Sequence, residues 1–152
     1  MKNIIVFFFI LSIASCKQKS KNEVTEINTT KEQIEEVSEK KCITKILDAD
    51  SKLGKERNTL CETVSLSETI KTYVAGMKAL DFENCPQDFT KAFNSHIEAW
   101  DAMIPVTDNY PDLRGEMHDL FKELEKSNDS IVFNKKLASI WDTWAIVEER
   151  IK

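Results

Sequence analysis

The stretch FNKKLASIWDTWAIVEERI, residues 133–151, decides the fold. Its apolar residues recur at steps of three and four, the spacing that places them on one face of an α-helix. They are Phe133, Leu137, Ile140, Trp144, Val147 and Ile151. A helix with one apolar face buries that face only by packing against other structure, so this stretch predicts helical neighbours.

Three earlier segments have the same spacing, residues 66–80, 89–103 and 113–124. Ser65 and Glu68 stand at the capping-box spacing that begins a helix. Short connections between the segments make consecutive helices antiparallel neighbours. The sequence therefore predicts an all-α domain, an antiparallel up-down four-helix bundle over residues 65–152.

Composition supports helices and excludes one class of function. The chain has only three Gly and three Pro, which are the residues that tight turns between strands require. Its net charge is −5, whereas a nucleic-acid-binding protein carries a basic surface, so no nucleic-acid partner is expected. The chain also lacks a glycine-rich phosphate loop and a nucleophile elbow, and we expect no enzymatic activity.

The first residues have the pattern of an export signal. Lys2 precedes a stretch that is apolar from Ile4 to Ile13 except for one serine, too short at roughly 15 Å to cross a bilayer of ~30 Å. The residues Ile13-Ala14-Ser15-Cys16 then resemble the lipobox of bacterial lipoproteins. The resemblance implies cleavage between Ser15 and Cys16 and acyl chains on Cys16. It also implies a lipid anchor on the extracytoplasmic side of a bacterial membrane, periplasmic or cell-surface.

The chain therefore divides into four predicted parts. Residues 1–15 are the signal peptide and residues 16–41 a lipid-anchored flexible tether, because the tether is rich in Lys and Glu and has almost no large apolar residues. Residues 42–64 form a separate segment before the bundle. Residues 65–152 form the bundle itself.

Beyond Cys16, the mature chain has three more cysteines, in a compartment where disulfides persist. We expect Cys42 to pair with Cys61, because a helix holds Cys61 and Cys85 about 22 Å apart. That disulfide clamps the segment before the bundle. Cys85 is then left over at a helix start, either as a reactive thiol or as a buried, inert one.

The two histidines offer one metal-binding hypothesis. Counting along antiparallel neighbours puts His96 level with Met117 and His118. A His and Met pair inside a helical bundle suits copper or a b-type haem. The other interpretation is an inward-facing His96 hydrogen-bonded to the Tyr73 hydroxyl or to a carbonyl, with no cofactor.

Acidic residues concentrate in the middle of the chain and predict an acidic surface. Such a surface attracts a basic protein partner, or it is a solvated face that keeps the protein in solution. Its members are Asp81, Glu83, Asp88, Asp101, Asp108, Asp112 and Glu116.

Together these patterns predict a lipid-anchored, extracytoplasmic helical module that binds an unknown ligand and is not an enzyme. The alternative is a carrier of metal or b-type haem that uses His96 with Met117 or His118. Residues 85–89 and 96–100 also resemble stretches of small helical lipoproteins to which no activity is attached.

Overall fold

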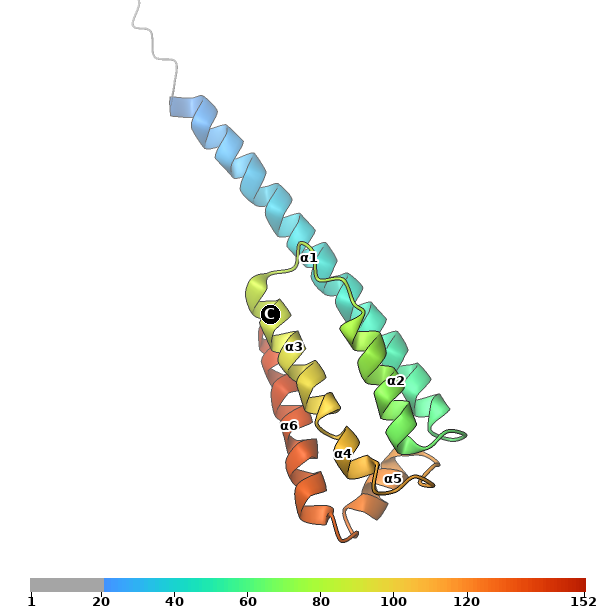
Figure 1. Ribbon diagram of the computed structural model, residues 1–152. Helices are drawn as coiled ribbons and strands as arrows, with labels where there is room; N and C mark the ends of the chain where they lie inside the picture. Colours follow the sequence, from blue (N-terminus) through green and yellow to red (C-terminus); the bar gives the residue numbers. More distant parts are fainter. Residues whose placement is uncertain (1–20) are drawn as a thin grey trace, which may run out of the picture. The chain divides into compact units, whose positions relative to one another are not determined.

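The computed structural model describes the backbone of residues 21–152 and the side chains of residues 33–152. Every regular element of this part of the chain is helical, so the prediction of an all-α fold is confirmed (Figure 1). Residues 35–152 form one compact unit. The helices are α1 (Lys21–Leu60), α2 (Leu66–Lys78), α3 (Gln87–Asp101), the single-turn α4 (Ile104–Thr107), α5 (Met117–Leu124) and α6 (Ser130–Glu149).

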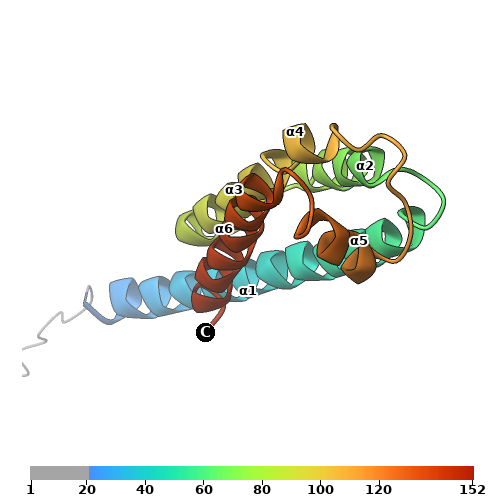
Figure 2. The same cartoon turned by 90° about the horizontal axis from the view of Figure 1, so that it is seen from below.

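Within the compact unit, α1, α2, α3 and α6 run in alternating directions along the chain (Figure 1). Helices α3 and α6 lie side by side in both ribbon views (Figures 1 and 2). The set of helices differs from the prediction. Residues 113–124 give only the eight-residue α5, and the long helix beside α2 is α1, which contains the segment expected to lie outside the bundle.

Helix α5 begins late because the residues before it are used in other contacts. The Leu66 amide donates to the Leu113 carbonyl at 2.7 Å, and the Gly115 amide donates to the Cys61 carbonyl at 2.8 Å. Gly115 has a φ of +150°, a backbone conformation that side chains with a Cβ rarely adopt. Residues 113–115 therefore pack against the turn between α1 and α2, and a helix starts only at Met117.

Helix α1 covers residues 21–41, where the sequence predicts a flexible tether, and all but the end of the predicted segment 42–64. The helix contains no proline, and its one glycine is Gly54. Residues 21–53 therefore contain no helix breaker. The Lys40 ammonium lies 2.6 Å from the Glu36 carboxylate, an i,i+4 pair of the kind that stabilises a helix in solvent. The many Lys and Glu residues are therefore compatible with a helix.

The exposure of apolar side chains changes along α1. Ile34 and Val37 are 66% and 67% exposed, whereas Cys42 and Ile46 are buried. Further along, Gly76 of α2 lies so close to α1 that an added Cβ would be 2.7 Å from a methyl carbon of Leu53. The apolar face of α1 therefore joins the core from Cys42 onward.

The predicted helix faces supply the core. The Ser65 hydroxyl accepts a hydrogen bond from the Glu68 amide at 3.4 Å and caps α2 as expected. The largest fully buried side chains come from the segments predicted from the apolar spacing and from α1. They include Ile46, Leu66, Ile70, Met77, Phe89, Phe93, Leu124, Phe133, Ile140 and Val147.

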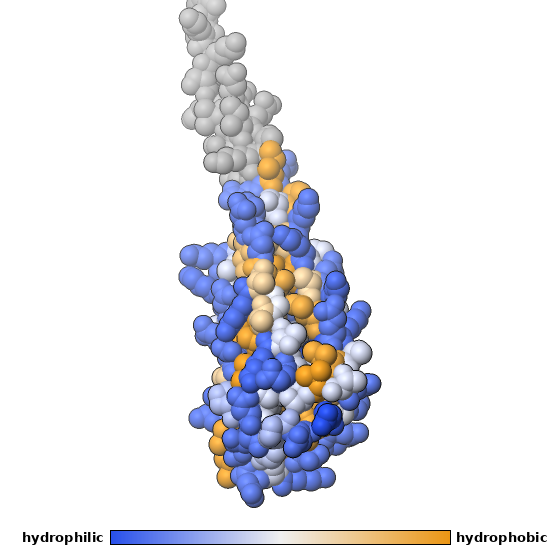
Figure 3. All heavy atoms as spheres, turned by 45° about the vertical axis from the view of Figure 1, so that its right-hand side comes forward, coloured by the Kyte–Doolittle hydropathy of each residue, from blue (hydrophilic) through white to orange (hydrophobic). Residues whose placement is uncertain are grey.

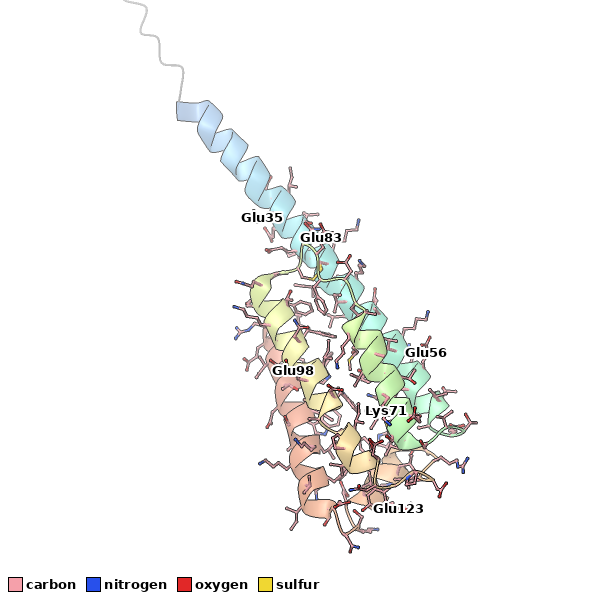
Figure 4. The ribbon with its side chains drawn as sticks, in the orientation of Figure 1. Glu35, Glu56, Lys71, Glu83, Glu98 and Glu123 are labelled. Carbon is pink, nitrogen blue, oxygen red and sulfur yellow. A yellow bond between two sulfur atoms is a disulfide. The ribbon has the colours of Figure 1, made fainter. Side chains whose placement is uncertain are left out.

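The disulfide joins Cys42 to Cys85, with the two Cα atoms 5.2 Å apart (Figure 4). The predicted pairing of Cys42 with Cys61 is wrong. Cys42 lies within α1 and Cys61 follows its last residue, so the continuous helix holds them roughly 28 Å apart at 1.5 Å per residue. Among the described residues, Cys61 is the one free cysteine and is buried, and Cys85 is not a reactive thiol.

Candidate functional site

His96 faces the interior, as predicted, but its partners are different. The Trp100 indole N–H donates to His96 Nε2 at 3.1 Å, so Nδ1 carries the proton and donates to the Thr143 hydroxyl, also at 3.1 Å. Burial lowers the pKa of His96, which keeps the imidazole neutral. Both ring nitrogens are occupied, and neither is available to a metal.

Met117 and His118 do not complete a ligand set with His96. Met117 is buried, whereas the His118 side chain is 83% exposed and its Nδ1 lies 2.8 Å from a Glu116 carboxylate oxygen. Within residues 33–152, no group of three or more His, Cys, Asp or Glu side chains is arranged to hold a metal ion. The geometry therefore gives no support to the copper or haem alternative.

The predicted acidic surface is interspersed with basic side chains, most of them from other helices. Figure 3 shows a face covered mainly by hydrophilic side chains with apolar groups between them, and Figure 4 labels Glu83 of the predicted set and Lys71, the partner of Asp108. Only Glu83 and Asp112 of the predicted set lack a basic partner among the described residues. The pairs are Asp81 with Lys45, Asp88 with Arg150, Asp101 with Lys78, Asp108 with Lys71 and Glu116 with His118.

A cavity of about 170 Å³ lies where α1, α3, α5 and α6 meet. Three polar side chains line it, Arg57 and Asn58 from α1 and His118 from α5. Its other walls are apolar or aromatic. They are formed by Trp100, Met117, Phe121, Leu137, Ile140 and Trp141.

Arg57 lies against two aromatic rings. Its guanidinium carbon is 4.4 Å from the centre of the Trp100 ring and 4.6 Å from the centre of the Tyr73 ring. The two rings are 5.2 Å apart and nearly perpendicular, so they form a corner that holds the cation. Cation–π attraction to both rings fixes the orientation of the guanidinium.

The guanidinium of Arg57 is only partly satisfied by hydrogen bonds. Its Nε and Nη2 both donate to the Asn58 side-chain oxygen, at 3.2 and 3.0 Å. Among the described residues, Nη1 has no acceptor and no carboxylate lies within 4.0 Å of the group. Among the described residues, the only fully buried side-chain polar atom without a partner is Thr69 Oγ1. Because Nη1 of Arg57 also lacks a partner, it is not fully buried and is accessible to solvent.

Two hydrogen bonds hold the aromatic corner in place. The Tyr73 hydroxyl donates to the Asp50 carboxylate at 2.7 Å, and burial together with this carboxylate raises the pKa of Tyr73. The Trp100 indole is fixed by its bond to His96. Burial lowers the pKa of Arg57 while the nearby Tyr73 and Asp50 oppose that shift, and an arginine remains charged at neutral pH.

The sequence placed Met117 and His118 near a site but did not single out Arg57. Arg57 is one basic residue in a charged helix, and its neighbours Tyr73 and Trp100 read as ordinary members of apolar stripes. No spacing rule connects residues 57, 73 and 100. The site exists only because three helices bring these side chains together.

The predicted signal peptide, the residues that resemble a lipobox and Cys16 lie outside the described residues. Among the helices of the described part, none combines the length and the apolar character needed to cross a membrane. Comparisons with protein-family models, with curated proteins and with solved structures found no match.

Proposed function

We propose that this protein is a lipid-anchored, extracytoplasmic binding module that takes a small ligand into the cavity beside Arg57. The observation that carries the proposal is the cavity itself. It combines apolar and aromatic walls with a few oriented polar groups, the usual composition of a small-molecule site. Its walls come from helices of the compact core, so the site is largely preformed.

Two observations support the proposed lipid-anchored, extracytoplasmic location. The lipobox residues end in Cys16, and two or three acyl chains on one cysteine hold a protein durably on a membrane. The Cys42–Cys85 disulfide also favours an exported protein, because disulfides persist in oxidising compartments.

We favour binding over catalysis because the reactive side chains are already hydrogen-bonded or buried. His96 has both ring nitrogens in hydrogen bonds, which leaves no free base there. The Cys61 thiol is buried, and burial raises its pKa, which lowers its reactivity. The basic protein partner stays a prediction, since most of the predicted acids already have basic neighbours.

Filling the cavity tests its role. Toluene is a suitable probe, because an apolar cavity of about 150 Å³ is known to hold benzene. We expect toluene to shift the Met117 methyl signal in NMR spectra of the purified full chain. Leu137→Trp fills the cavity and should abolish the shift, whereas Ile131→Trp, on an exposed position of the same helix, should not. A native protein that ignores toluene, or a folded Leu137→Trp variant that still responds, would contradict the proposal.

The anchor is tested separately by metabolic labelling with palmitate. Label should be incorporated by the native chain and by Cys61→Ala, which removes a buried thiol. It should be lost in Cys16→Ala. Label that survives in Cys16→Ala would contradict the lipid anchor without affecting the cavity.

A further inference from the structure

We infer that the cavity selects a small aromatic monocarboxylate, bound through the edge of Arg57 that carries Nη1 and Nη2. This inference rests on the proposed function, since it names the class of ligand for the same cavity. It adds a charge requirement that the apolar walls by themselves do not impose.

The hydrogen bonds of Arg57 decide which edge is free. Asn58 accepts from Nε and Nη2 and so occupies the side edge of the guanidinium. The end edge keeps one N–H of Nη1 parallel to one N–H of Nη2. Two parallel N–H groups match the two oxygens of a carboxylate, which is the bidentate pairing that arginine favours.

The surroundings leave this cation without an anionic partner of its own. The carboxylate of Asp50 raises the pKa of Arg57 from a distance, but it accepts its hydrogen bond from the Tyr73 hydroxyl. The acidic side chain nearest along the helix, Glu56, lies within 4 Å of Lys52 instead. A partly buried cation without a counter-ion favours an anionic ligand, because the pair is weakly screened by solvent.

The walls set the size and the single charge of the ligand. A volume of about 170 Å³ is well below the ~300 to 1,000 Å³ of sites for drug-sized molecules, so the ligand is close to a single ring with one substituent. Trp100, Phe121 and Trp141 offer aromatic surfaces to such a ring. Arg57 is the only lining side chain with a permanent positive charge, so the cavity matches a ligand with a single carboxylate.

Three probes of one shape separate charge from size. Benzoate, benzamide and benzamidine are anionic, neutral and cationic versions of one ring, and tryptophan fluorescence of the purified full chain reports on Trp100 and Trp141. We expect benzoate to bind at least about tenfold more tightly than benzamide, because hydrogen bonds to a charged group are the stronger ones. We expect no binding of benzamidine.

Variants assign the preference to Arg57. Arg57→Gln should weaken benzoate binding about tenfold or more and benzamide binding much less, while Arg57→Lys keeps the charge and part of the preference. Arg114→Gln, at an exposed arginine outside the cavity, is the matched control and should change nothing.

The outcomes separate the two proposals. Equal affinity of the native chain for benzoate and benzamide, or undiminished benzoate binding by Arg57→Gln, overturns the carboxylate assignment. The first comparison uses the native chain and holds even if Arg57→Gln does not fold. If the carboxylate assignment fails but toluene still binds in the cavity, the proposed function stands. If toluene also fails, the cavity is not a binding site.

Discussion

The two ends of the compact unit hold α1 by different chemistry. At one end the Cys42–Cys85 disulfide joins α1 to the residue before Pro86, and Lys45 pairs with Asp81 at 3.1 Å nearby. At the other end Arg57 of α1 lies against aromatic rings, the Gly115 amide donates to the Cys61 carbonyl just after α1, and a cavity remains. A covalent bond therefore holds α1 at one end, and non-covalent contacts around a cavity hold it at the other.

Removing the disulfide at one end of α1 should have the largest effect on the free energy of unfolding. The bond spans 43 residues, and closing a loop of that length stabilises a protein by about 4 kcal/mol in the chain-entropy model. We therefore expect a reducing agent to lower the free energy of unfolding in urea by about that amount. A Cys61→Ala background excludes thiol exchange with the free cysteine.

The Cys85→Ala variant is the control for that experiment. It lacks the disulfide from the start, so a reducing agent should have no further effect on its unfolding midpoint. Identical midpoints of the Cys61→Ala protein with and without the reducing agent would mean that the disulfide contributes nothing to stability.

At the cavity end, Gly115→Ala should be the next largest change. The φ of +150° strains any residue with a Cβ, and such strain costs about 1 to 3 kcal/mol. Because residues 113–115 lead into α5, we also expect weaker toluene binding. Urea unfolding and the toluene titration measure the two effects. A variant as stable as the native protein would show that this connection does not need glycine.

The interior between the two ends should respond to pH through His96. Burial lowers its folded pKa, so as pH falls below about 6.5 the unfolded chain takes up a proton that the folded chain does not. Stability should therefore fall with pH until the folded pKa is passed. Carboxylates with a lowered pKa, such as that of Asp108, should contribute only in more acidic solution, below about pH 4.

Two variants isolate that histidine. In His96→Gln the unfolding midpoint should depend less on pH between about pH 7.5 and 5.5 than in the native chain. Ser95→Ala, at an exposed serine next to His96 on the same helix, should retain the native dependence. The assignment fails if His96→Gln and the native chain lose stability equally over this range.

The smallest expected effect is a gain, from Gly54→Ala in α1 between the two ends. A Cβ there meets nothing within 4 Å, and alanine in place of a helix glycine stabilises by about 0.5 to 1 kcal/mol. Gly76→Ala is the contrasting variant, because its Cβ would lie 2.7 Å from a Leu53 methyl carbon and should destabilise. Thermal unfolding measures both. A loss of stability in Gly54→Ala would argue against a regular helix at this point.

The sequence alone determined that the domain is helical and which residues of α2, α3, α5 and α6 face its core. Phe89, Phe93, Phe133 and Ile140 repeat at helical spacing and are all in the core, and the Ser65 cap begins α2 where expected. Such features depend on neighbours three or four residues away, which the order of residues displays directly. The resemblance of residues 13–16 to a lipobox is equally local, and both the lipobox and the anchor on Cys16 stay predictions.

Only the tertiary structure decided which distant residues meet. Cys85 is the partner of Cys42, Arg57 lies in the corner of Tyr73 and Trp100, and lysines from α1 and α2 neutralise acids counted elsewhere in the chain. The packing of residues 42–60 as part of the core also depended on α2. A weakly amphipathic segment is ordered by the surface against which it packs. Contacts between distant residues depend on how whole helices pack together, and no local pattern records that.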